Sequence, residues 1–182
     1  MDPREAARSR PWLAVGRELT ELLDRVDPAQ FDAFADEATA AGTRWFFTGQ
    51  GRSGLVAQMA AMRFMHLGRE AHVLGEATAP SVRHGDRLVV VSGSGSTPVS
   101  LGFARIAEAE GARVLLVTFS PGSPLAELAD AVLVAPVVES EQLMGNLFEQ
   151  SALVLLDAVA IAVADSDPEA RAAMASRHTN MQ

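Results

Sequence analysis

The sequence lacks three residue types whose chemistry defines large groups of enzymes. Cysteine is absent, which excludes disulfides, thiolate nucleophiles, iron–sulfur clusters and cysteine-based zinc sites. Lysine is absent as well, so Schiff-base aldolase chemistry, a pyridoxal phosphate anchor and a Walker lysine are excluded. Tyrosine is also missing, and aromatic residues make up only 5% of the chain. These absences rule out covalent catalysis through a thiolate or a lysine amine.

The chain has a surplus of acidic residues and draws all of its positive charge from arginine. Fifteen arginines against 23 aspartates and glutamates leave a formal net charge of −8. Such a chain is unsuited to binding a nucleic-acid backbone, so we expect no nucleic-acid partner. An anionic ligand must therefore be bound by individual groups around its site, because the overall charge of the chain repels it.

The distribution of apolar residues argues against a membrane protein. The most apolar stretch, Leu147 to Ala164, contains Glu149 and Asp157 and is typical of a buried core helix. No apolar run of the signal-peptide type follows the arginines near the N-terminus. We therefore expect a cytoplasmic protein without a membrane partner.

Hydrophobic patterning predicts one domain over residues 1–182, with a helical arm at 1–43 and an α/β core at 44–182. Apolar residues recur at helical spacing in the arm. Beyond it, short apolar runs alternate with helical stretches, which is typical of βαβ units around a parallel sheet. The expected strands are Trp45–Thr48, Ala71–Leu74, Leu88–Ser92, Val114–Thr118 and Ala131–Ala135. The expected core helices are Leu55–Leu67, Pro98–Glu110, Pro124–Ala129, Met144–Ala164 and one starting at Asp167-Pro168. The pattern predicts a three-layer α/β/α sandwich with a five-stranded parallel sheet.

Two glycine-containing loops follow the first and third expected strands, where open parallel sheets place their ligands. The first loop, residues 49–54, matches the G-x-G-x-x-G pattern of dinucleotide-binding proteins, and Glu76 follows 22 residues after Gly54. Glycines that merely allow a tight turn between a strand and a helix explain the same pattern. Both interpretations stay open on this loop alone.

The second loop, residues 92–97, combines three serines and a threonine with two glycines directly before a helix that Pro98 opens. Hydroxyls and backbone N–H groups at a helix N-terminus form a cradle for an anion such as phosphate, and they need no lysine. Ser92, Ser94 and Thr97 are the expected donors. The alternative is that Thr97 only caps its helix and the rest of the loop is flexible.

Two side chains are candidates for proton transfer. Glu149 lies near the start of the longest apolar helix, where apolar neighbours suit a general base. Alternatively, it pairs with an arginine or lies at a solvated edge. His178, in a polar C-terminal segment, could supply an acid or base to a neighbouring subunit's site, or could belong to a frayed tail. The four histidines show no metal-ligand spacing with the carboxylates, so we expect no metal site.

Several stretches of the chain resemble the sugar isomerase (SIS) domain family and, within it, the 6-phospho-3-hexuloisomerases. The serine–glycine loop marks the family in general, and the other stretches resemble the hexuloisomerases in particular. The stretches that carry the resemblance are Gly49–Val56, Met62–Gly68, Gly75–Pro80, Ser92–Thr97, Leu147–Glu149 and Arg177–Asn180. The fold implied by the resemblance is flavodoxin-like.

The resemblance implies conversion of D-arabino-3-hexulose 6-phosphate into D-fructose 6-phosphate through a cis-enediol, within the ribulose monophosphate pathway and without a cofactor or metal. It implies that Glu149 moves the proton between carbons and that His178 assists oxygen protonation from an adjacent subunit of a homotetramer. The substrate-binding residues that it implies are Gly51, Arg52, Ser53, Ser92, Ser94, Ser96 and Thr97.

The sequence departs from the family pattern in the serine–glycine loop. Ser96 stands where the family usually has a glutamate, and Gln50 stands where alanine is common. Two alternatives therefore stay open. One is an SIS isomerase that acts on arabinose 5-phosphate or sedoheptulose 7-phosphate, and the other is an SIS module that binds a sugar phosphate without turning it over.

Overall fold

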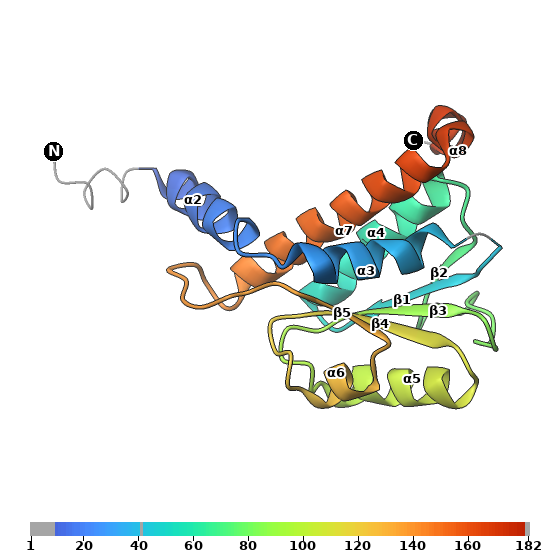
Figure 1. Ribbon diagram of the computed structural model, residues 1–182, viewed down its shortest axis with the longest axis horizontal. Coiled ribbons are helices and arrows are strands. Elements are labelled where there is room, and N and C mark those ends of the chain that lie inside the picture. The colour runs from blue at the N-terminus through green and yellow to red at the C-terminus, as the bar shows by residue number, and fades with distance from the viewer. Residues whose placement is uncertain (1–9, 41, 181–182) are drawn as a thin grey trace, which may run out of the picture.

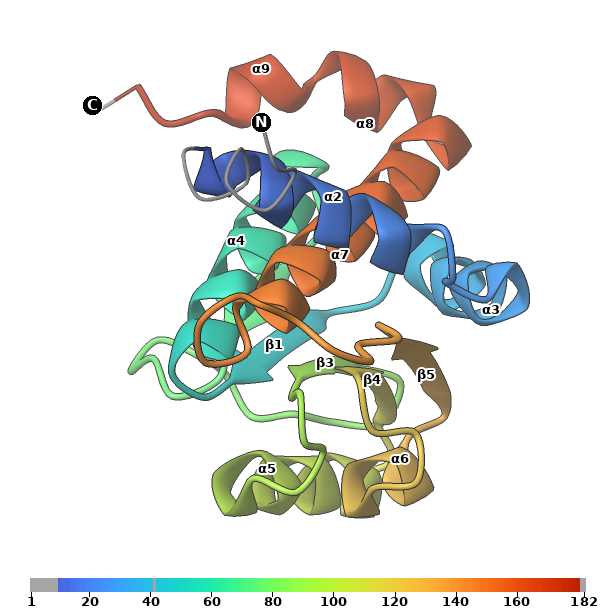
Figure 2. The same ribbon diagram turned by 90° about the vertical axis from the view of Figure 1, so that its left-hand side faces the viewer.

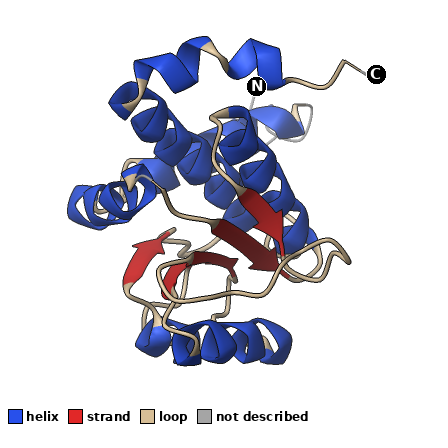
Figure 3. Cartoon of the chain, turned by 90° about the vertical axis from the view of Figure 1, so that its right-hand side faces the viewer, coloured by secondary structure: helices blue, strands red, loops and turns tan. Residues whose placement is uncertain are grey.

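The computed structural model describes residues 10–40 and 42–180, so residues 1–9 of the expected arm lie outside the described residues. A five-stranded parallel sheet with the order β2-β1-β3-β4-β5 forms the centre of the chain, and helices cover both of its faces (Figures 1 and 3). The strands are β1 (Trp45–Gly49), β2 (Ala71–Val73), β3 (Arg87–Val91), β4 (Arg113–Thr118) and β5 (Ala131–Val134). This strand order is that of flavodoxin-like folds, which confirms the predicted three-layer sandwich.

The helices form two layers of unequal size. One face of the sheet is covered by α3 (Pro28–Thr39), α4 (Arg52–His66) and α7 (Asn146–Ser166). The other face is covered by α5 (Pro98–Ala109) and α6 (Pro124–Leu128) (Figure 1). Helix α2 (Pro11–Leu23) crosses α7 (Figure 2) and extends beyond the body of the molecule (Figure 1). After α7 the chain continues through α8 (Pro168–Ala172) and α9 (Met174–Arg177), which contacts α4.

Alternation along the strands divides the core into two apolar clusters. Trp45 and Phe47 of β1 pack on the side of α4 and α7, whereas Phe46 between them packs on the side of α5. All three side chains are fully buried. Successive side chains of a strand point to opposite faces, so a sheet covered on both faces requires this nearly continuous apolar run.

Helix α7 is apolar and long enough to cross a membrane by length and composition, and it is the one such helix among residues 10–40 and 42–180. It packs against α2, α3 and α4, and Ala152, Leu156 and Val159 lie in the core. The prediction of a core helix for this stretch is confirmed.

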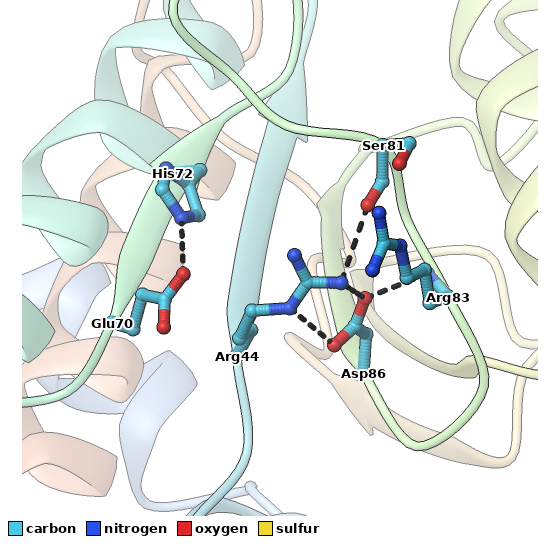
Figure 4. Close-up of polar contacts among 6 residues, drawn as sticks. All are labelled: Arg44, Glu70, His72, Ser81, Arg83 and Asp86. Atoms are coloured by element: carbon cyan, nitrogen blue, oxygen red, sulfur yellow. Dashed lines mark hydrogen bonds and ion pairs between the residues drawn. The ribbon is translucent and has the colours of Figure 1, made fainter.

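Ion pairs stabilise the amino ends of the strands, opposite the edge where ligands are expected. Arg44, directly before β1, forms a two-point ion pair with Asp86, directly before β3, at 2.9 and 2.6 Å (Figure 4). Asp86 also accepts a hydrogen bond from the Arg83 N–H at 2.7 Å. Glu70 and His72 approach each other to 3.2 Å at the start of β2 (Figure 4). These side chains are therefore paired with one another at this edge and serve to hold the strands.

Several helix boundaries differ from the predicted ones for reasons of backbone geometry. Helix α4 begins at Arg52 instead of Leu55. The positive φ of Gly51, +57°, lets the chain turn sharply from β1 into the helix. Helix α7 begins two residues later than predicted, because Met144 and Gly145 both have positive φ, which is incompatible with a right-handed helix. Ser123 caps the N-terminus of α6, since its hydroxyl accepts a hydrogen bond from the Ala126 N–H at 3.4 Å.

Candidate functional site

The two glycine-containing loops lie side by side at the carboxyl edge of the sheet. Strands β1 and β3 are direct neighbours, with Gly49 paired in register with Val91. From this point α4 leaves towards one face of the sheet and α5 towards the other (Figure 1). In open α/β sheets such a switch point forms the crevice that binds ligands.

The first loop requires its glycines for the turn itself. A Cβ atom on Gly49 would lie 2.6 Å from the carbonyl oxygen of Ser53, and one on Gly54 would lie 2.9 Å from the carbonyl oxygen of Gly49. Gly51 adopts φ +57° and ψ −130°, a conformation reserved for glycine. The tight turn therefore accounts for the G-x-G-x-x-G pattern, and it places Arg52 and Ser53 in the first turn of α4.

The serine-rich loop presents hydroxyls that the fold does not use. The Ser92 hydroxyl is buried without a hydrogen-bond partner among the described residues. Thr97 precedes α5 without a side-chain capping bond, so the alternative that it only caps its helix is wrong. Ser96 donates to the Ser94 hydroxyl at 3.1 Å. A buried hydroxyl without a partner costs about 1–3 kcal/mol, a cost that an anionic ligand would remove.

The conformation of the serine-rich loop is fixed by its neighbours. Gly95 has φ +62°, and a Cβ atom there would collide with the Ser123 hydroxyl. Its carbonyl oxygen accepts a hydrogen bond from the Leu125 N–H at 3.0 Å. The Thr118 hydroxyl donates to the Gly93 carbonyl oxygen at 2.8 Å. The loop is thus held from two sides, which contradicts the alternative of a flexible loop.

Glu149 and Arg52 form an ion pair across the two helices that begin at this edge. The Arg52 Nε donates to Glu149 Oε2 at 2.5 Å. The Glu149 side chain is 15% exposed and that of Arg52 58% exposed. The alternative that Glu149 pairs with an arginine is thus confirmed, and its partner Arg52 is itself a predicted site residue. A carboxylate that can accept a proton thus lies beside a cation that can stabilise negative charge on an oxygen.

The start of α7 also lies against the serine-rich loop. Phe148, directly before Glu149, is buried, and a Cβ atom on Gly93 would lie 3.1 Å from its ring. The structure therefore brings the first turn of α4, the serine-rich loop and Glu149 together. Asp157 pairs with Arg63 at 3.6 Å further along the two helices.

His178 does not lie with these groups. Its ring stacks on that of His66 at the C-terminal end of α4, with ring centroids 5.3 Å apart. Arg52 lies at the other end of this 15-residue helix, about 20 Å away at a rise of ~1.5 Å per residue. Burial lowers the pKa of His66, and the charges of His178 and Arg63 lower it further. The neighbouring Arg177 donates to the His66 carbonyl oxygen at 3.2 Å, so the segment is packed instead of frayed.

A separate hollow of about 300 Å³ lies beside β2. Glu76 and Thr78 of the loop after β2 line it together with Met62 and Met65 from the outer face of α4. No local sequence pattern predicts this hollow, because four of its ten lining residues come from α4 and the others lie in or after β2. Among residues 10–40 and 42–180, no three histidine, aspartate or glutamate side chains gather in a way that could hold a metal ion.

One further residue lies at this edge without a sequence motif that marks it. Phe119 directly follows β4, the neighbour of β3, and its side chain is 40% exposed. Its ring meets that of Phe148 in a T-shaped contact with centroids 5.6 Å apart. The signal that could have drawn attention to Phe119 is its position at the carboxyl end of a strand, the criterion applied to the two glycine-containing loops.

Comparison with known proteins agrees with this arrangement. Residues 40–162 match the model of the SIS domain family. Two curated proteins named 3-hexulose-6-phosphate isomerase are similar to the chain over 91% of its length. The one from Mycobacterium gastri is 40% identical, with 86% of that protein covered, and the one from Methylomonas aminofaciens is 33% identical, with 94% covered.

A solved structure resembles the chain over nearly its whole length. It is that of a Methanococcus jannaschii protein for which the function of 3-hexulose-6-phosphate isomerase has been inferred, and it has a TM-score of 0.82 at 29% identity. It covers 94% of this chain, and 99% of its own chain is matched. The chain described here belongs to the SIS domain family.

Proposed function

We propose that this chain is a 3-hexulose-6-phosphate isomerase, which interconverts D-arabino-3-hexulose 6-phosphate and D-fructose 6-phosphate through a cis-enediol. The relatives named for this activity support the substrate. The observation that carries the mechanism is the convergence of a phosphate-type loop with the Arg52–Glu149 pair at the β1/β3 switch point. The whole of residues 1–182 is one SIS domain in this proposal.

The serine-rich loop holds the phosphate group of the substrate. Ser92, Ser94, Ser96 and Thr97 offer hydroxyls, and the first turn of α5 offers backbone N–H groups at the positive end of its dipole. The buried, unpaired hydroxyl of Ser92 supports this role, because phosphate would supply the missing acceptor. Ser96 provides a hydroxyl where the family usually has a glutamate.

Glu149 transfers the proton between C2 and C3. It removes the proton from C2, a double bond forms between C2 and C3, and the carbonyl oxygen on C3 becomes the enediolate oxygen. The C3 oxygen then accepts a proton from His178, the C2 hydroxyl gives its proton back to the same imidazole, and the proton on Glu149 moves to C3, which leaves the carbonyl group on C2. Arg52 stabilises the negative charge on the oxygen, and Gly51 and Ser53 bind the sugar hydroxyls. The ion pair with Arg52 fixes the direction of the carboxylate.

The proposed enzyme is a homotetramer in which His178 of a neighbouring subunit protonates the enediolate oxygen. The distance between His178 and Glu149 along α4 supports a role in a second subunit's site. An exposed apolar stripe on α4, continued on α7, supports self-association. The stripe consists of Leu55, Met59, Met62 and Met65 on α4 and of Val154 and Ile161 on α7. The cytoplasm and the ribulose monophosphate pathway, where formaldehyde is fixed, are the proposed setting.

A coupled assay tests this function. Purified protein receives ribulose 5-phosphate, formaldehyde, a hexulose-phosphate synthase and a chelator, and the formation of fructose 6-phosphate is followed. We expect rapid formation that the chelator does not slow, because the proposed residues act without a metal or an organic cofactor. Lack of formation by a folded sample would contradict the proposal. A thermal-shift screen with arabinose 5-phosphate and sedoheptulose 7-phosphate would then separate another isomerase from a binding module.

A further inference from the structure

Phe119 is an aromatic residue at the functional edge to which the proposed mechanism gives no role. It directly follows β4, whose neighbour β3 leads into the serine-rich loop. Its side chain is 40% exposed, so burial in the core does not explain an aromatic ring at this position. What the ring touches instead is the serine-rich loop and the start of α7.

Gly93 of the serine-rich loop is held from two directions by Phe119 and its neighbours. A Cβ atom on Gly93 would lie 2.7 Å from the Phe119 ring and 3.1 Å from the Phe148 ring, so both rings cover the α-carbon. The Gly93 carbonyl oxygen accepts hydrogen bonds from the Phe119 N–H at 3.2 Å and from the Thr118 hydroxyl at 2.8 Å. The position of the loop relative to β4 is therefore fixed through Gly93.

The same two rings connect the loop to Glu149. Phe119 and Phe148 meet edge to face, with an interplanar angle of 86°. Phe148 is 3% exposed and directly precedes Glu149 in the first turn of α7. Contacts thus run from Gly93 of the serine-rich loop through Phe119 and Phe148 to the residue in the chain next to Phe148, Glu149.

We propose that Phe119 is a positioning residue that, together with Phe148, sets the spacing between the phosphate-binding loop and the carboxylate of Glu149. This inference rests on the proposed function. A substrate anchored by its phosphate presents C2 and C3 at a fixed distance from the anchor, so the base must stand at a matching distance. A misplacement of about 1 Å costs up to about 10²-fold in rate. An aromatic pair provides a stiff spacer, because each ring has few rotatable bonds and a preferred contact angle.

The test replaces Phe119 in the full chain and separates turnover from phosphate binding. For Phe119→Ala we expect kcat in the coupled assay to fall about tenfold, because the spacing relaxes. Inhibition by inorganic phosphate should change less than about twofold, because the hydroxyl donors remain in place. Phe119→Tyr keeps the ring and should restore kcat. Ile106→Ala removes another exposed apolar side chain, on the outer face of α5, and serves as the matched control.

The proposal fails if Phe119→Ala leaves kcat unchanged, if inhibition by phosphate weakens as much as kcat, or if Phe119→Tyr does not restore turnover. Phe119→Leu replaces the alanine variant if that variant does not fold. A cycle with Phe148→Leu adds a second criterion, since residues acting as one spacer give losses that do not add. An inactive wild-type chain would instead contradict the proposed function, so the two failures are distinguishable.

Discussion

The Arg52–Glu149 ion pair orients the carboxylate and keeps a cation beside it, and both features suit a group that transfers a proton. The pair fixes the direction of Glu149, which is largely buried, while Arg52 remains mostly exposed and available to an incoming ligand. Asp157 offers a comparison on the same helix, because it also pairs with an arginine, Arg63, but at 3.6 Å and with a half-exposed side chain. The two carboxylates share a helix and a type of partner, but only Glu149 lies in the first turn of α7, directly after the Phe148 that packs against the serine-rich loop.

Replacement of this carboxylate tests its proposed role. We expect Glu149→Gln to lower kcat by about 10³-fold, because the amide cannot take up the proton. Binding of fructose 6-phosphate, followed by calorimetry, should persist, because the serine-rich loop is unchanged. Asp157→Asn is the matched control and should retain activity within about twofold. Full turnover by Glu149→Gln would show that another group moves the proton.

At the scale of elements, the arm helix α2 holds the loop that leads into α7. Glu18 of α2 accepts hydrogen bonds from the Ser140 hydroxyl at 2.6 Å, the Glu141 N–H at 2.9 Å and the Gln142 amide at 3.1 Å. Partial burial raises the pKa of Glu18, but these hydrogen bonds and nearby Arg17 together bring it below its usual value. The loop ends directly before α7, so one carboxylate on α2 supports the approach to Glu149.

The lowered pKa gives this contact a defined pH dependence. Glu18 in the unfolded chain titrates near 4.5, so its contribution to stability is present above that pH and is lost as the pH falls through the lower folded-state pKa. We expect Glu18→Gln to lower the free energy of unfolding at pH 7 by about 1 kcal/mol and the difference from wild type to shrink below pH 4.5. Urea unfolding of both proteins at pH 7 and at a pH below 4.5 measures this difference in the free energy of unfolding.

Glu21→Gln provides the control for that measurement. Glu21 lies on the same helix, and its one ion pair among the described residues is with Arg17, at 3.8 Å and with both side chains more than half exposed. Exposed pairs of this kind contribute little. A difference for Glu18→Gln that does not depend on pH, or an equal loss for Glu21→Gln, would contradict the role given to the Glu18 carboxylate.

The elements also show which features the sequence could predict. Strands and loops at the carboxyl edge follow from local patterns, so the strands and the serine-rich loop were predicted to within a residue or two. The partner of Glu149 lies 97 residues earlier in the chain, and no local pattern encodes that contact. The aromatic contact between Phe119 and Phe148 likewise arises from packing between β4 and α7. Local periodicity predicts elements, whereas contacts between distant elements require the fold.

At the scale of the whole molecule, the two ends of α4 carry two halves of the proposed machinery. Arg52 with Glu149 lies at the N-terminal end, and His66 with His178 lies at the C-terminal end. The exposed apolar stripe runs along the helix between them. If two copies pair through this stripe with their helices antiparallel, the C-terminal end of one α4 meets the N-terminal end of the other. Such a pair would bring His178 to a second copy's Glu149.

Mixing two inactive variants tests this arrangement. Glu149→Gln and His178→Ala each disable every site in their own assemblies, but co-expressed subunits form some sites with Glu149 from one chain and His178 from the other. With random pairing we expect about a quarter of the wild-type activity. Glu149→Gln mixed with the doubly substituted chain is the control and should stay inactive, because no chain supplies the carboxylate. Activity no higher than that of the separate variants would mean that His178 does not act across subunits.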